Sequence, residues 1–310
     1  MKIIIGQSYS FHQMGMRNNQ EDARFPDDDA PKAGHPFYLV CDGVGGRDMG
    51  EMASSTVCQA FAKALAKTDF REEFTTEQFS QALDQAYDAL DATSRRLDDV
   101  QFSTTMTFVA FHAGGCMAAH IGDSRIYQIR PHVGIIYRSD DHSLVNQMVR
   151  SGMISPDEVE NHPQGNVITR FMAPVEDDES RSRATVVNLK DVQGGDYFFL
   201  CTDGVLHCVD DDKLARIITK SRDTASAIKE IAALCEKSTD NNTATLIPVV
   251  DVVGAERAEV ERVFTGQQET VRKPNSNATA NEVESVKPHE KPKEEKKSGG
   301  LKGIFKKIFH

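Results

Sequence analysis

The sequence lacks any apolar run long enough to cross a membrane, and its first ten residues are too polar to form a signal peptide. Excess basic charge is also missing: the formal net charge is -11, which argues against nucleic acid as the main partner. A phosphorylated substrate is not excluded, because bound divalent ions can reverse the local charge. We therefore expect a cytoplasmic protein that does not bind nucleic acid.

Closely spaced cysteine pairs are absent as well. The six cysteines include no C-x-x-C pair, and most of them lie inside apolar runs. This distribution predicts reduced thiols packed in the core rather than a disulfide framework or a zinc site. No other side chain stands beside a base in a recognisable nucleophile pattern.

One stretch, residues 40–54 (VCDGVGGRDMGEMAS), combines an acidic residue with glycines. The apolar run 37–41 predicts a buried strand that ends at Asp42. Glycines follow at once, and a helix is predicted to begin just after Gly50. The carboxylate of Asp42 and the backbone oxygen of Gly43 could bind a hard cation. The alternative interpretation is an ordinary Asp-Gly turn.

The rest of the chain alternates between helical and strand periodicity. Short β-rich runs with tight links predict a four-strand antiparallel meander, because parallel strands need long crossovers. The expected strands are 3–5, 103–111, 116–121, 125–130, 133–137, 184–189, 196–204 and 244–250, and the expected helices are 51–67, 75–97, 211–220 and 223–237. Residues 150–180 are polar and rich in turns, which indicates a surface excursion that often carries substrate contacts.

Two further carboxylates, Asp203 and Asp240, repeat the position of Asp42 at the end or the start of a predicted strand. Several converging carboxylates suit Mn²⁺ or Mg²⁺, and two such ions can activate water for attack on phosphorus. An arginine could bind the phosphate oxygens. The residues alone therefore predict metal-dependent hydrolysis of a phosphate ester.

Eight motifs occur in an order that resembles the metal-dependent serine/threonine protein phosphatases of type 2C (the PPM family), particularly the small bacterial members. They are RNNQED (17–22), VCDGVGG with GEMAS (40–54), STTMT (103–107), IGDSRIY (121–127), DDHSLV (140–145), HPQGNVITR (162–170), FLCTDGV (199–205) and DNNTAT (240–245). The resemblance covers residues 5–250 and implies an α+β fold, a four-layer α-β-β-α sandwich of two antiparallel sheets flanked by helices.

The resemblance also implies a role for each motif residue. Asp42 would bridge two metal ions and act with Arg17, which would bind the substrate phosphate. The resemblance also implies that Gly43 binds a metal ion through its backbone oxygen. Asp203 and Asp240 would bind one ion, and Glu21 and Asp22 would bind the other. Asp123 would bind a weaker third ion. Residues 150–180 would form a flap beside the site.

Three positions depart from the family pattern. Val44 stands where some relatives carry a histidine, and Ser238-Thr239 replace two glycines, which would tighten that loop. His207 stands where relatives often have an aspartate, which puts the third metal site in doubt. Two other functions stay open: a catalytically weak phosphopeptide-binding module of the same fold, and a phosphatase of small phosphorylated metabolites.

The expected partners are proteins phosphorylated on serine or threonine and a bacterial kinase pathway. The bacterial phosphatases that the chain resembles include those of type VI secretion gene clusters. We expect a monomer. Composition predicts a phosphatase domain over 1–253, a disordered charged linker over 254–300 and a short basic amphipathic tail over 301–310. The tail is suited to an anionic membrane surface, which would place the protein peripherally at the inner membrane, or to a partner protein.

Overall fold

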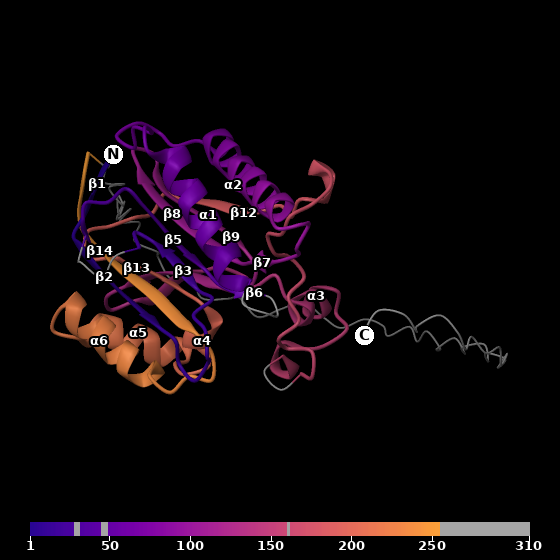
Figure 1. The fold of residues 1–310 in the computed structure, drawn as a ribbon. Helices are drawn as coiled ribbons and strands as arrows, with labels where there is room; N and C mark the ends of the chain where they lie inside the picture. Colours follow the sequence, from indigo (N-terminus) through magenta and orange to yellow (C-terminus); the bar gives the residue numbers. More distant parts are fainter. Residues whose placement is uncertain (28–31, 45–48, 160–161, 255–310) are drawn as a thin grey trace, which may run out of the picture. The chain divides into compact units, whose positions relative to one another are not determined.

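The computed structural model describes residues 1–27, 32–44, 49–159 and 162–254, and Figure 1 shows its helices and strands. The strands are β1 (Lys2–Ile5), β2 (Gln7–Gln13), β3 (Ala23–Phe25), β4 (Lys32–Ala33), β5 (Phe37–Cys41), β6 (Gly43–Val44), β7 (Ser103–Thr104), β8 (Met106–His112), β9 (Gly115–Ile121), β10 (Arg125–Arg130), β11 (Gly134–Arg138), β12 (Thr185–Leu189), β13 (Tyr197–Cys201) and β14 (Asn242–Val253). The helices are α1 (Gly50–Leu65), α2 (Thr76–Arg96), α3 (Leu144–Arg150), α4 (Asp203–Leu206), α5 (Asp211–Lys220) and α6 (Thr224–Cys235), with 3₁₀ turns η1 (Pro156–Glu158) and η2 (Asp178–Ser180).

The strands form two antiparallel sheets. The seven-stranded sheet has the order β11-β10-β13-β14-β2-β4, and β1 also pairs with β14. The five-stranded sheet has the order β12-β9-β8-β5-β3, and β6 and β7 form a separate two-stranded ribbon. The antiparallel pairing predicted from the short links is therefore confirmed for both sheets.

Three apolar clusters hold the layers together. Helices α1 and α2 pack on the five-stranded sheet through buried side chains such as Phe61 and Phe108. Helices α5 and α6 pack on the seven-stranded sheet through residues such as Ile231 and Phe199, and Tyr38 lies in the cluster between the two sheets. Figure 1 shows the two helical layers on opposite sides. The predicted four-layer α-β-β-α sandwich is confirmed.

Local sequence signals fix the helix ends. Thr75 caps α2: its side chain accepts from the backbone of Gln78, whose side chain accepts from the Thr75 N–H in return. Ser143 caps α3 in the same position before the first turn, accepting from Asn146. The Thr75 cap agrees with the predicted start of the helix over 75–97.

The single meander predicted over residues 103–137 is wrong. Strands β8 and β9 pair in one sheet, whereas β10 and β11 pair in the other. The link from Gly122 to Ser124 therefore crosses between the sheets and is not a hairpin turn. Gly122 has a φ of 106°, and a Cβ there would lie 2.6 Å from a side-chain atom of Thr105, so glycine is needed at this crossing.

Within the described ranges, no helix is long and apolar enough to cross a membrane. The predicted linker and basic tail lie outside the described residues, apart from the beginning of the linker at Gly254. Residues 45–48 of the glycine-rich stretch also lie outside them.

Candidate metal centre

The strand registers bring five acidic residues to one end of the sandwich. Ala23 pairs with Cys41 in antiparallel register. Asp22, which precedes Ala23, therefore lies opposite Asp42, which follows Cys41. In the other sheet Arg125 pairs with Cys201, which sets Asp123 opposite Asp203.

Asp240 reaches the same end from β14. Cys201 pairs with Ala244 across β13 and β14, so the residues that precede β14 lie beside the Asp203 turn. Gly204 keeps these two segments close, because a Cβ there would overlap the carbonyl oxygen of Asn241. Both sheets therefore supply carboxylates to one site.

The carboxylates are mostly removed from water and repel one another. Asp22 is only 3% exposed, and burial, followed by the charges of Asp203 and Asp240, raises its pKa to about 7. Burial and the charges of Asp22 and Asp203 raise the pKa of Asp42 well above its ordinary value. The pKa of Asp203 is also raised, mainly by burial. This accumulation of negative charge is unfavourable without bound protons or cations.

Two oxygen atoms of the cluster lack hydrogen bonds. Oδ1 of Asp22 and Oδ1 of Asp203 are buried and have no hydrogen-bond partner among the described residues. No three acidic, histidine or cysteine side chains of the described part of the chain stand close enough to enclose an ion without adjustment. Hard divalent cations prefer such carboxylate oxygens, so the donor set fits Mn²⁺ or Mg²⁺.

Backbone contacts hold Glu21 and Gly43 together. The N–H of Gly43 donates to the carbonyl oxygen of Glu21 at 3.1 Å, and the hydroxyl of Ser54 donates to the same oxygen at 2.6 Å. A Cβ at Gly43 would overlap the carbonyl oxygens of both Glu21 and Gly50. Glycine at 43 is therefore required for the close approach of β6 to the start of α1.

Arg17 lies at the rim of the carboxylate cluster. Its Nη2 donates to Oδ2 of Asp240 at 2.7 Å, and its Nε donates to the carbonyl oxygen of Thr239 at 3.2 Å. Its side chain is 53% exposed, so its guanidinium faces both the cluster and solvent.

The proposed third position combines Asp123 with His207. Burial, followed by the charges of Asp203 and Asp141, raises the pKa of Asp123 to about 7. Nε2 of His207 lies 4.0 Å from Oδ2 of Asp203. An imidazole therefore stands beside the carboxylate of Asp203.

Sequence reasoning missed several residues that position the carboxylates. The amide of Asn241 donates to the carbonyl oxygens of Met14 and Asn19 and accepts from the N–H of Glu21, at 2.8–2.9 Å. It thereby fixes the loop that carries Arg17. The motif DNNTAT contained this residue, but its amide could be assigned a role only once the partners were placed more than 200 residues away.

Three threonines orient the aspartates. Thr202 donates to Oδ2 of Asp22 at 3.1 Å. The hydroxyl of Thr105 accepts from the N–H of Asp42, while the hydroxyl of Thr104 donates to its carbonyl oxygen. The backbones of Thr104 and Met172 also form an isolated antiparallel β-bridge. The later part of the 150–180 excursion therefore lies next to the strand that orients Asp42.

The loop before Asp240 is held by Ser238. Its hydroxyl donates to the carbonyl oxygen of Gly204 at 2.9 Å, and its own carbonyl oxygen accepts from Met16. Val44 is 36% exposed at the end of β6 and carries no titratable group.

Cys41 directly precedes Asp42 but is not accessible for attack on a substrate phosphate. Its side chain is fully buried in the cluster between α1 and the five-stranded sheet, and burial raises its thiol pKa well above the ordinary value. All six cysteines are free, as the sequence predicted.

Comparison with known proteins gives one consistent family. A model described as protein phosphatase 2C matches residues 18–244. A putative protein phosphatase 2C-type of Streptococcus pyogenes is 30% identical over 229 residues, which are 70% of this chain and 82% of that protein.

Solved structures share the fold. The catalytic domain of the serine/threonine protein phosphatase PstP, in complex with two manganese ions, is 25% identical with a TM-score of 0.64, covering 80% of this chain and all of that one. PppA of Pseudomonas aeruginosa, described as a key regulatory component of its type VI secretion system, is 26% identical with a TM-score of 0.59, covering 79% of this chain and 99% of that one.

Proposed function

The chain belongs to the protein phosphatase 2C family, and from this membership we propose which of its residues hydrolyse the phosphate ester. It is a metal-dependent serine/threonine protein phosphatase that uses two Mn²⁺ or Mg²⁺ ions. The observation that carries the assignment of residues is the convergence of buried, mutually repelling carboxylates from both sheets.

Asp42 takes the central position, with the carbonyl oxygen of Gly43 as its neighbour. Asp203 and Asp240 would hold one ion, and Glu21 and Asp22 the other, directly or through water. Bound divalent cations supply charge neutralisation and a water of lowered pKa. The hydrogen bonds that Thr202 and Thr104 donate, and the one that Thr105 accepts, hold Asp22 and Asp42 in the orientation that this requires.

Arg17 would bind the substrate phosphate. Its guanidinium can donate two parallel hydrogen bonds to phosphate oxygens, and its exposed side leaves it accessible to a phosphoprotein. Asp123 with His207 would form a weak third position, because imidazole is a poorer partner for Mg²⁺ than carboxylate.

The test uses phosphothreonine peptides and, in parallel, sugar phosphates. We expect hydrolysis of the peptides only when Mn²⁺ or Mg²⁺ is added. Undiminished activity in excess chelator would overturn the assignment, and preference for sugar phosphates would make this a metabolite phosphatase instead. Binding of phosphopeptide without turnover in any metal would make it a binding module.

We further propose a cytoplasmic monomer that opposes a bacterial serine/threonine kinase. The likeness to PppA favours a kinase pathway of a type VI secretion system. Gel filtration with light scattering tests the monomer, and dephosphorylation of a kinase encoded nearby tests the pathway.

Residues 301–310 are proposed as a docking segment separate from the phosphatase domain over 1–253. Their sequence, LKGIFKKIFH, alternates bulky apolar residues with lysines at helical spacing. Deleting 300–310 should leave turnover of a soluble phosphopeptide unchanged and abolish co-sedimentation with anionic vesicles or capture of a partner. If the intact chain associates with neither, the docking role is excluded.

A further inference from the structure

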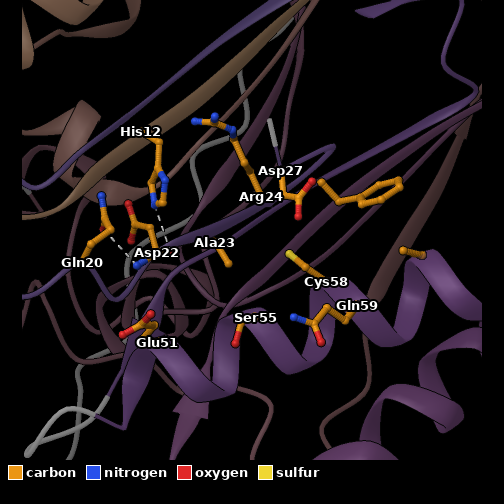
Figure 2. Close-up of a pocket in the computed structure, with 12 residues that line it drawn as sticks. His12, Gln20, Asp22, Ala23, Arg24, Asp27, Glu51, Ser55, Cys58 and Gln59 are labelled. Carbon is orange, nitrogen blue, oxygen red and sulfur yellow. Dashed lines mark hydrogen bonds between the residues drawn. The ribbon is translucent and has the colours of Figure 1, made fainter. Parts of the chain in front are cut away.

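A cavity of about 540 Å³ lies between α1 and the strand β3 (Figure 2). Asp22 and Glu51 line it near the carboxylate cluster, and Cys58 and Gln59 line it farther along α1. Figure 2 shows the sulfur of Cys58 directed from α1 toward the chain around Ala23 and Arg24. A small polar molecule that enters this cavity therefore reaches a thiol.

That thiol faces a second one. Sγ of Cys58 lies 3.7 Å from Sγ of Cys41. Cys58 is 4% exposed and lines the cavity, whereas Cys41 is 0% exposed and does not line it. Cys41 is the last residue of β5, so the residue that follows it is Asp42.

We infer that Cys58 and Cys41 form an oxidisable dithiol site, in which a hydroperoxide entering the cavity drives a disulfide that displaces Asp42. This inference rests on the proposed function, because it concerns regulation of the same carboxylate site. The sulfur of Cys58 attacks one peroxide oxygen and becomes a sulfenic acid, while the other oxygen leaves as an alcohol or water.

The sulfur of Cys41 then attacks the sulfenic sulfur, which forms the S–S bond and releases water. Two thiols are oxidised by two electrons in total, and the peroxide is reduced by the same two electrons. An external dithiol reverses the step by exchange and becomes a disulfide itself.

We expect the bond to shift the end of β5 relative to α1. A disulfide requires a sulfur separation of about 2.05 Å, so the two sulfurs must approach by roughly 1.6 Å. Asp42 is bonded directly to Cys41, and the start of α1 contacts Gly43. A misplacement of about 1 Å can cost about a hundredfold in rate, so oxidation should disable the site without unfolding the protein.

The chain offers its own control pair. Cys208 and Cys235 also interact, in the cluster under α5 and α6. Cys208 is half-buried and Cys235 is buried, whereas Cys41 and Cys58 are both buried, so the control pair is the more exposed of the two pairs. Substituting Cys58 or Cys235 therefore distinguishes the two pairs while leaving every proposed metal ligand intact.

The experiment uses the full chain as wild type, Cys58→Ala and Cys235→Ala. Each protein is treated with hydrogen peroxide in chelator, the peroxide is removed with catalase, and Mn²⁺ is then added. Activity on a phosphothreonine peptide is measured across an Mn²⁺ titration, and disulfides are mapped by mass spectrometry of non-reduced peptides. Cys58→Ser replaces the alanine variant if that variant does not fold.

We expect a Cys41–Cys58 linkage in oxidised wild type, a loss of activity of at least about tenfold, and recovery with dithiothreitol. Cys58→Ala should keep its basal activity and resist peroxide, while Cys235→Ala should be inhibited like wild type. Absence of the linkage, or protection by Cys235→Ala alone, overturns the inference. A reduced protein that is inactive in every metal would instead contradict the proposed function, and the linkage map would remain readable.

Discussion

Arg17 donates to a carboxylate oxygen of Asp240 at 2.7 Å, so the cation proposed to bind substrate phosphate is paired with a proposed metal ligand. The side chains are 53% and 27% exposed, and an ion pair this accessible to water contributes only about 0–1 kcal/mol. Arg17 can therefore exchange this carboxylate for a phosphate at small cost.

Substitution of Arg17 should mainly weaken substrate binding. Arg17→Ala is expected to raise KM for a phosphothreonine peptide by about tenfold or more, because each lost charge-assisted hydrogen bond contributes about 1.5–3 kcal/mol. Arg17→Lys should recover only part of this, since lysine keeps the charge but not the paired donors. Steady-state kinetics at saturating Mn²⁺ measure both, and an unchanged KM in Arg17→Ala would contradict the phosphate-binding role.

Asp42→Asn should remove nearly all turnover while the fold persists. The substitution removes one negative charge from the carboxylate cluster and should weaken the binding of both proposed ions. The control is Asp212→Asn, an exposed aspartate in the first turn of α5. If Asp42→Asn retains more than about a tenth of the wild-type rate, a barrier change of only about 1.4 kcal/mol, Asp42 does not bridge the ions.

Asn241→Ala should lower both stability and activity. Its amide bonds to backbone groups of Met14, Asn19 and Glu21, and its side chain is buried, so truncation removes three partly buried hydrogen bonds that contribute about 0.5–1.5 kcal/mol each. Urea unfolding and kcat/KM measure the two effects. Asn188→Ala, at an exposed position of the edge strand β12, is the matched control, and an equal effect in both variants would refute the positioning role.

In chelator the protein should lose stability as pH rises from about 4 to about 7. The folded-state pKa of Asp22 is about 7, above its unfolded value, so folding is favoured while Asp22 holds its proton and loses this contribution as the pH approaches 7. Thermal unfolding between pH 5 and pH 8 should therefore show a falling Tm. Mn²⁺ should reverse the trend, because the cation replaces the proton, and Asp22→Asn should flatten the chelated profile. A Tm that rises with pH in chelator would be incompatible with the raised pKa.

His207→Asp should lower the Mn²⁺ concentration needed for full activity. The substitution places a carboxylate beside Asp203, where the imidazole now lies 4.0 Å from Oδ2 of Asp203, and carboxylate is the better ligand for Mn²⁺ or Mg²⁺. The measurement is an activity titration with Mn²⁺ at fixed peptide. A curve that stays in place or shifts to higher concentration counts against a third metal position here.

Local patterns predicted much of this molecule. The apolar run before Asp42, the Thr75 cap and the acidic residues at strand ends are short-range signals, and each is found where it was expected. The linkage between β9 and β10 was not predictable in this way. Whether two strands joined by a short link pair or diverge depends on distant partners, here β12 for β9 and β13 for β10.

The positioning amide of Asn241 was missed for the same reason. Its partners Met14, Asn19 and Glu21 lie at the other end of the sequence. The motif resemblance assigned the proposed site residues because it compares whole patterns, whereas the hydrogen bonds that orient them become visible only in three dimensions.

The last described strand, β14, pairs with β13, β2 and β1, and it follows directly after Asp240. A ribosome-bound chain that has not yet released β14 therefore lacks both one proposed ligand and the strand that joins the N-terminal strands to β13. We therefore expect a chain that ends before β14 to be inactive as a phosphatase, because Asp240 and the pairing partner of both β13 and β2 are missing from it.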